Sequence, residues 1–203
     1  MITAQEALQR LKDGNSRFAS DSPQTPPTDS NRRQELVAGQ KPFAIVLACS
    51  DSRAPVETIF DQGLGDLFIV RVAGNIAAPT QIGSIEFAAE HFGSPLVVVL
   101  GHQNCGAVKA TLAELKSPSG APSPNLSSII KHIVPAVENL ADSGDDAEAL
   151  LQHAVRANVR SAAAELRSQS ELLDQFIADG RVTVVGAEYS LATGKVEFLD
   201  ETA

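Results

Sequence analysis

The sequence predicts an α/β fold with a mostly parallel central sheet flanked by helices. Short apolar runs rich in β-branched residues recur along the chain, and amphipathic helical patterns lie between them. Such alternation of strand and helix is typical of parallel sheets that are covered by helices on both faces. The length of 203 residues suits one compact domain, so we expect residues 1–203 to form a single unit.

The chain is expected to begin with an amphipathic helix and an extended arm. Thr3 and Glu6 have the spacing of a capping box. Apolar residues on one helical face follow: Ala4, Ala7, Leu8 and Leu11. Three prolines then favour an extended connector at residues 20–31. Because an apolar-faced helix on an arm needs a surface that covers it, we expect residues 1–35 to pack on a second copy of the chain.

Three apolar runs are predicted to form buried parallel strands, at residues 43–49, 67–73 and 96–100. Helical patterns follow these runs, at residues 55–60, 80–92 and 106–115. Each strand is therefore connected to the next through a helix, as a parallel sheet requires.

The last part of the chain is predicted to be mainly helical and to complete the sheet. A loop rich in serine and proline covers residues 117–125, and an amphipathic helix follows it to Leu140. A longer helical stretch covers residues 145–178 and is broken near Ser170. Two further strands are predicted, a parallel strand at residues 182–186 and an antiparallel edge strand at residues 195–199.

The composition excludes several classes of function. The chain carries 16 Lys and Arg against 25 Asp and Glu, a formal net charge of -9, and has no basic cluster larger than Arg32-Arg33. We therefore expect no nucleic-acid and no membrane partner. No apolar run approaches the roughly 20 residues that span a bilayer, and the first residues lack the features of a signal peptide. We expect a cytoplasmic protein with a small-molecule or protein partner.

The residues with the richest chemistry follow two of the predicted strands. Residues 49–53 read CSDSR at the end of the first strand, and residues 101–106 read GHQNCG at the end of the third. Because ligands collect beyond the carboxyl ends of parallel strands, we expect both cysteines, His102 and Asp51 to meet at one rim. Polar residues that close the second strand have lower priority as turn formers: Arg71, Gly74 and Asn75.

This set of donors favours a zinc site. Zinc binds thiolate, imidazole and carboxylate in tetrahedral geometry, and His102 and Cys105 are three residues apart between two glycines. In a cytoplasmic chain, Cys49 and Cys105 are more plausible as metal ligands than as a disulfide. The alternative is that both cysteines pack as small buried hydrophobic residues.

Asp51 has two competing partners, the metal and the guanidinium group of Arg53. If Asp51 joins Cys49, His102 and Cys105, four ligands saturate the ion. If Asp51 pairs with Arg53, one position stays open for water and for catalysis. An Asp-Arg pair of this spacing is also commonly a structural or solvated ion pair. The other histidines are not assigned to a metal: His91, His132 and His153.

Three motifs in this order resemble those of the β-class carbonic anhydrases. They are CSDSR at residues 49–53, VRVAGN at residues 70–75 and GHQNCG at residues 101–106. The resemblance is strongest over residues 39–109 and looser in the N-terminal arm and the helical tail.

The resemblance implies one Zn²⁺ per chain, held by Cys49, His102 and Cys105, with Asp51 as a fourth ligand or released to Arg53. It further implies a carbonate dehydratase, a zinc lyase that reversibly hydrates carbon dioxide to bicarbonate and a proton. In the family, zinc-bound hydroxide attacks carbon dioxide. Asp51 would accept a hydrogen bond from that hydroxide, and Arg53 would keep the carboxylate ionised.

The resemblance also implies a homodimer, or a dimer of dimers, with the active site at the subunit interface. Gln40 matches a glutamine that enters from the partner subunit and hydrogen-bonds a substrate oxygen, and the N–H of Gly106 would be a second donor. The apolar wall of the carbon dioxide pocket would consist of Phe68, Ala73 and Phe87. Each of these wall residues is equally well explained by core packing.

A subclass of the family is regulated by bicarbonate at a second site. Its members carry tryptophan three residues before the first cysteine and glycine immediately before it. This chain has Val46 and Ala48 at these positions and no tryptophan. The resemblance therefore implies the subclass without bicarbonate regulation, with zinc open to water at neutral pH.

Three other functions are compatible with the same residues. Some relatives hydrolyse carbonyl sulfide or carbon disulfide at the same kind of zinc site. A catalytically silent zinc-binding assembly protein is an alternative from another class. A redox protein that uses Cys49 and Cys105 is less favoured, because the chain has no CxxC motif.

Overall fold

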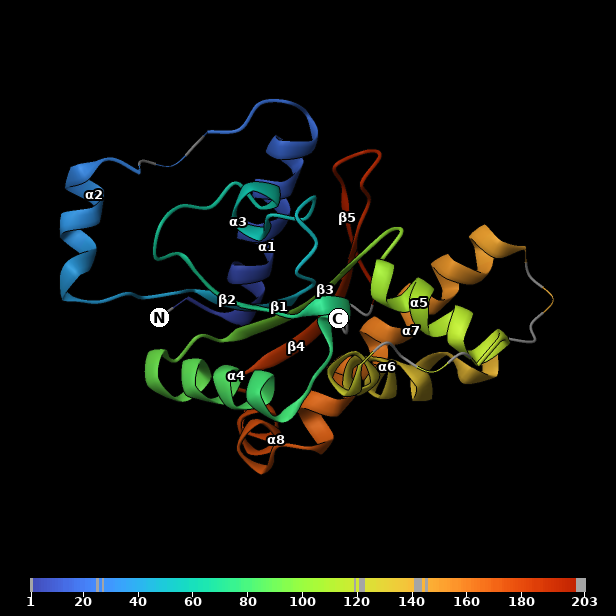
Figure 1. The fold of residues 1–203 in the computed structure, drawn as a ribbon. Helices are drawn as coiled ribbons and strands as arrows, with labels where there is room; N and C mark the ends of the chain where they lie inside the picture. The colour runs from blue at the N-terminus through green and yellow to red at the C-terminus, as the bar shows by residue number, and fades with distance from the viewer. Residues whose placement is uncertain are drawn as a thin grey trace.

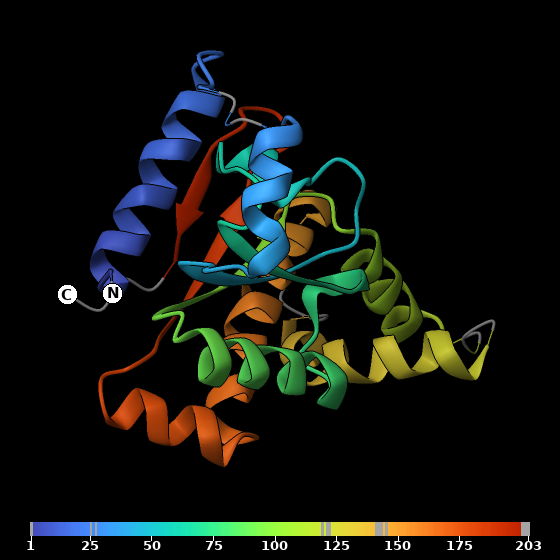
Figure 2. The same cartoon turned by 90° about the vertical axis from the view of Figure 1, so that its left-hand side faces the viewer.

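The structure is a computed structural model that describes residues 2–24, 26, 28–118, 120, 123–140, 144 and 146–199. A central sheet has helices on both of its faces (Figures 1 and 2). The strands are β1 (Ala44–Ala48), β2 (Leu67–Arg71), β3 (Leu96–His102), β4 (Thr183–Tyr189) and β5 (Val196–Phe198). The α-helices are α1 (Ala4–Ala19), α2 (Ser30–Glu35), α3 (Val56–Ile59), α4 (Pro79–Phe92), α5 (Gly106–Lys116), α6 (Pro124–Val137), α7 (Ala147–Ser168) and α8 (Glu171–Ala178). Short 3-10 helices are η1 (Leu36–Ala38), η2 (Ala73–Asn75) and η3 (Glu138–Leu140).

The sheet has five strands in the order β2-β1-β3-β4-β5. β1 pairs in parallel with β2 and β3, β3 pairs in parallel with β4, and β5 joins β4 as an antiparallel edge strand. This arrangement confirms the predicted fold class, including the edge strand. Ala48, the last residue of β1, lies opposite Arg71 of β2 and Leu100 of β3. The carboxyl ends of these three strands therefore meet at one rim.

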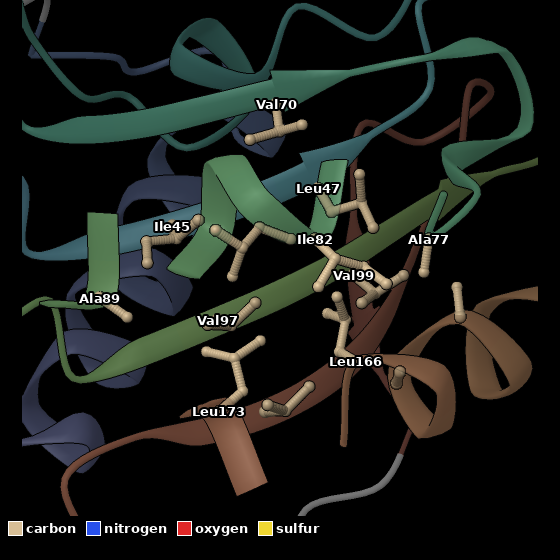
Figure 3. Close-up of a cluster of buried hydrophobic side chains, with 14 of the residues drawn as sticks. Ile45, Leu47, Val70, Ala77, Ile82, Ala89, Val97, Val99, Leu166 and Leu173 are labelled. Atoms are coloured by element: carbon tan, nitrogen blue, oxygen red, sulfur yellow. The ribbon is translucent and has the colours of Figure 1, made fainter. Parts of the chain in front are cut away.

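Apolar side chains cover both faces of the sheet, because successive residues of a strand point to opposite sides. On one face, Ile45 and Leu47 of β1 pack with residues of β3, α4, α7 and α8 (Figure 3). On the other face, Val46 and its neighbours pack against α1 and α3. β1 and β3 are buried along their whole length, which explains why their sequences are continuous apolar runs.

The apolar face of α1 is covered differently from the expectation. The predicted capping box is present, with the N–H of Glu6 donating to Thr3 Oγ1 at 3.2 Å and the N–H of Thr3 donating to the Glu6 carboxylate at 2.7 Å. Ala7 and Leu11 are fully buried among residues of the same chain. Glycine at position 14 permits this contact, because it lets α1 approach the backbone of Phe60 closely. The apolar stripe therefore does not need a second copy of the chain to cover it.

The arm contains a helix that its sequence did not reveal. α2 begins at Ser30 after Asp29, whose carboxylate caps the helix by accepting from the N–H of Arg32 at 2.9 Å. The expectation of an extended connector is therefore wrong for residues 30 and 31. A helix can form here because no proline follows Asp29 in this segment. α2 and η1 contain no buried residues, and α2 lies apart from the sheet in Figure 1. Residues 25 and 27 of the predicted connector lie outside the described residues.

The other predicted elements agree with the structure apart from small shifts at their ends. Ser170 is the N-cap of α8, so the break that separates α7 from α8 is confirmed. β2 ends at Arg71, because the left-handed conformation of Gly74, with φ 75°, turns the chain into η2. Residues 119, 121 and 122 of the predicted loop, and residue 145, lie outside the described residues. Within the described part of the chain, no helix combines the length and the apolar character that crossing a membrane requires.

Gly14→Ala is expected to destabilise the protein, although alanine in a helix interior normally stabilises relative to glycine by about 0.5–1 kcal/mol. A Cβ at this position would lie 1.8 Å from the carbonyl oxygen of Phe60. We expect the free energy of unfolding, measured by chemical denaturation, to fall by about 1–3 kcal/mol. Ser16→Ala changes an exposed residue of the same helix and should stay within about 0.5 kcal/mol of the wild type. Equal stability of the two variants would contradict the close contact.

Candidate metal centre

The ends of β1 and β3 bring the predicted metal ligands together. Cys49 follows β1 directly, His102 is the last residue of β3, and Cys105 is the N-cap of α5. The chain turns between His102 and Cys105 through Asn104, whose φ of 56° is left-handed. Because β1 and β3 run in parallel and in register, Cys49 emerges beside the end of β3.

Three donor atoms form a compact cluster at this rim. The Sγ atoms of Cys49 and Cys105 and a ring nitrogen of His102 all lie within 4.8 Å of one another. The three residues are buried, and both cysteines are free thiols. Donors that share one tetrahedral zinc ion lie roughly 3.3–3.8 Å apart, so small movements would close this cluster around an ion. Within the described residues, no other group of Cys, His and acidic side chains has this spacing.

Nε2 of His102 is the nitrogen that fits a metal. His102 is 1% exposed, and its Nδ1 lies 2.9 Å from the carbonyl oxygen of Gln103. Because that oxygen can only accept, Nδ1 carries the proton and Nε2 carries the lone pair. Nε2 is buried without a hydrogen-bond partner among the described residues. A bound metal ion would satisfy this otherwise unpaired atom, so the donor set fits zinc.

Cys49 is held by the turn that follows β2. The N–H of Gly74 donates to Sγ of Cys49 at 3.3 Å. Gly74 has a φ of 75°, and a Cβ at this position would lie 2.8 Å from Cδ1 of Ile133, so the turn requires glycine. Nδ2 of Asn158 in α7 donates to the carbonyl oxygen of Gly74 at 2.8 Å and fixes the same turn.

Sequence reasoning gave Gly74 low priority and did not identify Asn158. Asn158 could have been noticed as a polar residue in the otherwise apolar buried face of α7, next to Ala154, Val155 and Val159. A buried amide needs a hydrogen-bond partner. The three-dimensional structure was necessary to identify that partner, because it lies 84 residues away in the sequence.

Asp51 pairs with Arg53 beside the cluster. Its Oδ1 accepts from the N–H and from Nε of Arg53, each at 2.9 Å, and its Oδ2 accepts from Nη2 at 2.8 Å. Oδ2 also lies 3.8 Å from Nε2 of His102. Arg71 fixes the loop, since it donates to the carbonyl oxygens of Cys49 at 3.0 Å and of Asp51 at 2.7 Å. Of the two partners expected for Asp51, a metal ion and Arg53, the structure shows the pairing with Arg53.

The neighbouring charges shift the pKa of each group in the site. Hydrogen bonds from Arg53 hold the pKa of Asp51 well below its usual range. A hydrogen bond from Cys105 lowers the pKa of Cys49, and the same contact raises the pKa of Cys105, because adjacent thiols readily release one proton and retain the other. Burial acts to lower the pKa of His102, but the neighbouring Cys49, the carbonyl group of Gln103 and the charge of Asp51 together outweigh it and raise that pKa. A divalent cation would favour loss of the remaining thiol proton.

Two further predicted residues lie at the rim. Ala73 is the first residue of η2, next to the glycine that contacts Cys49. Gly106 is the first residue of α5, so its N–H belongs to the helix-terminal donors that intrahelical hydrogen bonds leave unsatisfied. Both positions are adjacent in sequence to residues of the cluster or of its supporting turn.

Phe68, Phe87 and Gln40 lie elsewhere in the chain. Phe68 pairs with Ile45, four residues before Cys49, which at about 3.3 Å per residue places it roughly 13 Å from the rim. The rings of Phe68 and Phe87 have centroids 6.4 Å apart, and Phe87 is 52% exposed. Gln40 is exposed and lies between η1 and β1, at the opposite end of that strand from Cys49. Within one chain, these three residues do not line the cluster.

Comparisons with known proteins agree on one family. The family model for carbonic anhydrase matches residues 44–196. The chain is 41% identical over 195 residues to a carbonic anhydrase of Mycolicibacterium smegmatis, and the matched region covers 94% of this chain and 91% of that protein. The solved β-carbonic anhydrase CcaA is 25% identical with a TM-score of 0.75, over 97% of this chain and 92% of that chain. A tetrameric β-carbonic anhydrase of Sordaria macrospora, at 23% identity, shares the fold with a TM-score of 0.76 over 98% of both chains.

Cys105→Ser is expected to lose stoichiometric zinc, because a serine hydroxyl does not replace a thiolate as a zinc ligand. Zinc would be measured by elemental analysis of the purified protein, with circular dichroism as the check of the fold. His153→Ala removes an exposed histidine of α7 and should keep one zinc ion per chain. A full complement of zinc in folded Cys105→Ser would contradict the assignment of the cluster.

Proposed function

This chain belongs to the β-class carbonic anhydrases and is a carbonate dehydratase, and we propose that it works with one zinc ion held by Cys49, His102 and Cys105. The observation that carries the proposal is the buried cluster of two thiols and an imidazole, with the Asp51 carboxylate beside it. When bound, zinc would lower the pKa of a coordinated water toward neutrality, which makes that water a nucleophile toward carbon dioxide.

Asp51 and Arg53 would orient the attacking water. Arg53 keeps the Asp51 carboxylate ionised, so that carboxylate can only accept a hydrogen bond. Because Oδ2 lies 3.8 Å from Nε2 of His102, it is close enough to the cluster to accept a hydrogen bond from a water held there. The water would then direct a lone pair toward the carbon atom of the substrate.

The substrate would lie between this rim and residues of a second subunit. We propose that the N–H of Gly106 and the amide of Gln40 of the partner subunit donate to the substrate oxygens, and that Ala73 contributes to an apolar wall. Phe68 and Phe87 of the partner subunit would complete the wall, since neither lies at the rim of its own chain. The exposed segment that contains α2 and η1 supports this arrangement, because these helices bury no residue within the chain. The arm, residues 1–35, would therefore pack on the partner through α2, while its own chain covers α1, in a homodimer or a dimer of dimers.

We further propose that the enzyme belongs to the subclass without bicarbonate regulation. The positions that carry tryptophan and glycine in the regulated subclass are Val46 and Ala48, and both are packed in the core of the sheet. The pairing of Asp51 with Arg53 would leave a fourth position for water on a zinc ion held by Cys49, His102 and Cys105. Two free thiols in close proximity also suit a reducing compartment, so the proposal includes a cytoplasmic location.

Asp51→Asn is expected to lower kcat/KM for carbon dioxide hydration by about 100-fold or more while zinc content stays unchanged, because the amide no longer enforces one orientation of the water. Stopped-flow assays from about pH 6.5 to about pH 9 bracket the neutral range in which zinc acidifies water. Wild-type activity should rise toward alkaline pH. Since the pKa of Asp51 is far below this range, no loss from its protonation is expected at the acidic end.

Asp174→Asn makes the same substitution on the exposed surface of α8 and serves as the control. It should keep wild-type rates across the pH range. If Asp51→Asn also kept wild-type rates, catalysis would not use this carboxylate.

A complementation experiment tests whether Gln40 acts in the site of the partner. Gln40→Ala and Cys105→Ser are each expected to have low activity as homodimers. In a mixed dimer, the Gln40→Ala chain supplies an intact cluster and the Cys105→Ser chain supplies an intact Gln40, so one complete site forms. Unfolding and refolding the two variants together should therefore restore activity to well above the sum of the separate variants. No restoration in demonstrated mixed dimers would place Gln40 outside the partner's site.

A further inference from the structure

Gln103 is the residue that fixes the ring of His102. Its carbonyl oxygen lies 2.9 Å from Nδ1 of His102. The chain turns sharply after Gln103, because Asn104 takes a left-handed φ of 56°. The N–H of Gln103 donates to the carbonyl oxygen of Tyr189 at 3.0 Å and ties this residue to β4. The position of Gln103 therefore determines the hydrogen bond to the imidazole.

Ser190 holds the side chain of Gln103. Its Oγ donates to Oε1 of Gln103 at 3.1 Å, and both residues are half-buried. The same Oγ accepts from the N–H of Thr193 at 3.3 Å. Gln103 is thus attached at two points, by its backbone to Tyr189 and by its side chain to the next residue. Two attachments restrict the rotation of the peptide group that carries the accepting carbonyl.

The turn that carries Ser190 is itself fixed. The N–H of Ser190 donates to the carbonyl oxygen of Lys195 at 2.8 Å, and the N–H of Gly194 donates to that of Ser190 at 3.0 Å. The side chain of Asn15 in α1 makes two hydrogen bonds to the backbone of this turn and of β5. Its Nδ2 donates to the carbonyl oxygen of Gly194 at 2.8 Å, and its Oδ1 accepts from the N–H of Val196 at 2.8 Å. Ser190 therefore has a defined position from which to hold Gln103.

We infer that Ser190 is a positioning residue for His102 and acts through Gln103. By fixing Gln103, it keeps Nδ1–H of His102 bonded to a carbonyl oxygen, and this keeps Nε2 as the nitrogen that binds the metal. The inference rests on the proposed ligation of zinc by His102. It extends the site to the turn between β4 and β5, which lies outside all three sequence motifs.

Ser190→Ala in the full chain is expected to weaken zinc binding about fivefold, the equivalent of one typical net hydrogen bond. Zinc affinity would be measured by competition with a chelator. Gln103→Met removes the acceptor from the other side and should weaken binding to a similar extent. The double variant should be no weaker than either single variant, because both substitutions remove the same contact. Ser190→Thr keeps the hydroxyl and should bind zinc as the wild type does.

Thr193→Ala is the matched control. It removes the hydrogen bond that Thr193 Oγ1 accepts from the N–H of Lys195 at 3.3 Å, so it loosens the same turn without touching Gln103. Its zinc affinity should equal that of the wild type. In the zinc-loaded proteins, nitrogen NMR should show faster exchange of the His102 Nδ1–H with water in Ser190→Ala than in Thr193→Ala.

Three results would overturn the inference while leaving the proposed function intact. These are wild-type zinc affinity in Ser190→Ala, an equal loss of affinity in Thr193→Ala, and additive losses in the double variant. Wild-type protein that takes up no zinc would overturn the proposed function, and the inference with it.

Discussion

The parallel pairing of β1 with β3 is the constraint on which the candidate site depends. Both strands are buried on both faces, so a shift in register would move apolar side chains out of two cores at once. The register from Ile45–Val97 to Ala48–Leu100 fixes where each strand ends. The residues that follow, Cys49 on one strand and His102 on the other, are brought together by the sheet itself. The geometry of the donors is thus a consequence of core packing.

Burial of the donors links metal binding to the stability of the protein. Burial of two thiols and an imidazole is unfavourable if these groups lack a hydrogen-bond or metal partner. Nε2 of His102 has no hydrogen-bond partner within the described residues. Two of the three donors are nevertheless held by neighbouring groups, Cys49 by the N–H of Gly74 and His102 by the carbonyl oxygen of Gln103. The chain therefore preorganises the ligands before a metal binds. An ion that binds the folded state and satisfies these donors also stabilises that state.

The fold class and the cluster could be predicted from the sequence because both depend on local patterns. Continuous β-branched runs indicate buried parallel strands, and cysteine and histidine at the ends of two such strands indicate a metal site. The supporting contacts could not be predicted, because Asn158 and Ser190 are ordinary polar residues until their distant partners are known. The sequence also left open whether Asp51 pairs with Arg53 or with zinc. The covering of α1 by its own chain also depends on a long-range contact, the approach of Gly14 to Phe60.

Catalysis by this site would depend on the coordination of zinc by two sulfurs and one imidazole. X-ray absorption at the zinc edge of the purified protein measures the type and number of ligand atoms directly. We expect two sulfur atoms at about 2.3 Å and two lighter atoms, one of them an imidazole nitrogen, at about 2.0–2.1 Å. A zinc ion surrounded by nitrogen and oxygen alone, or by a single sulfur, would contradict it.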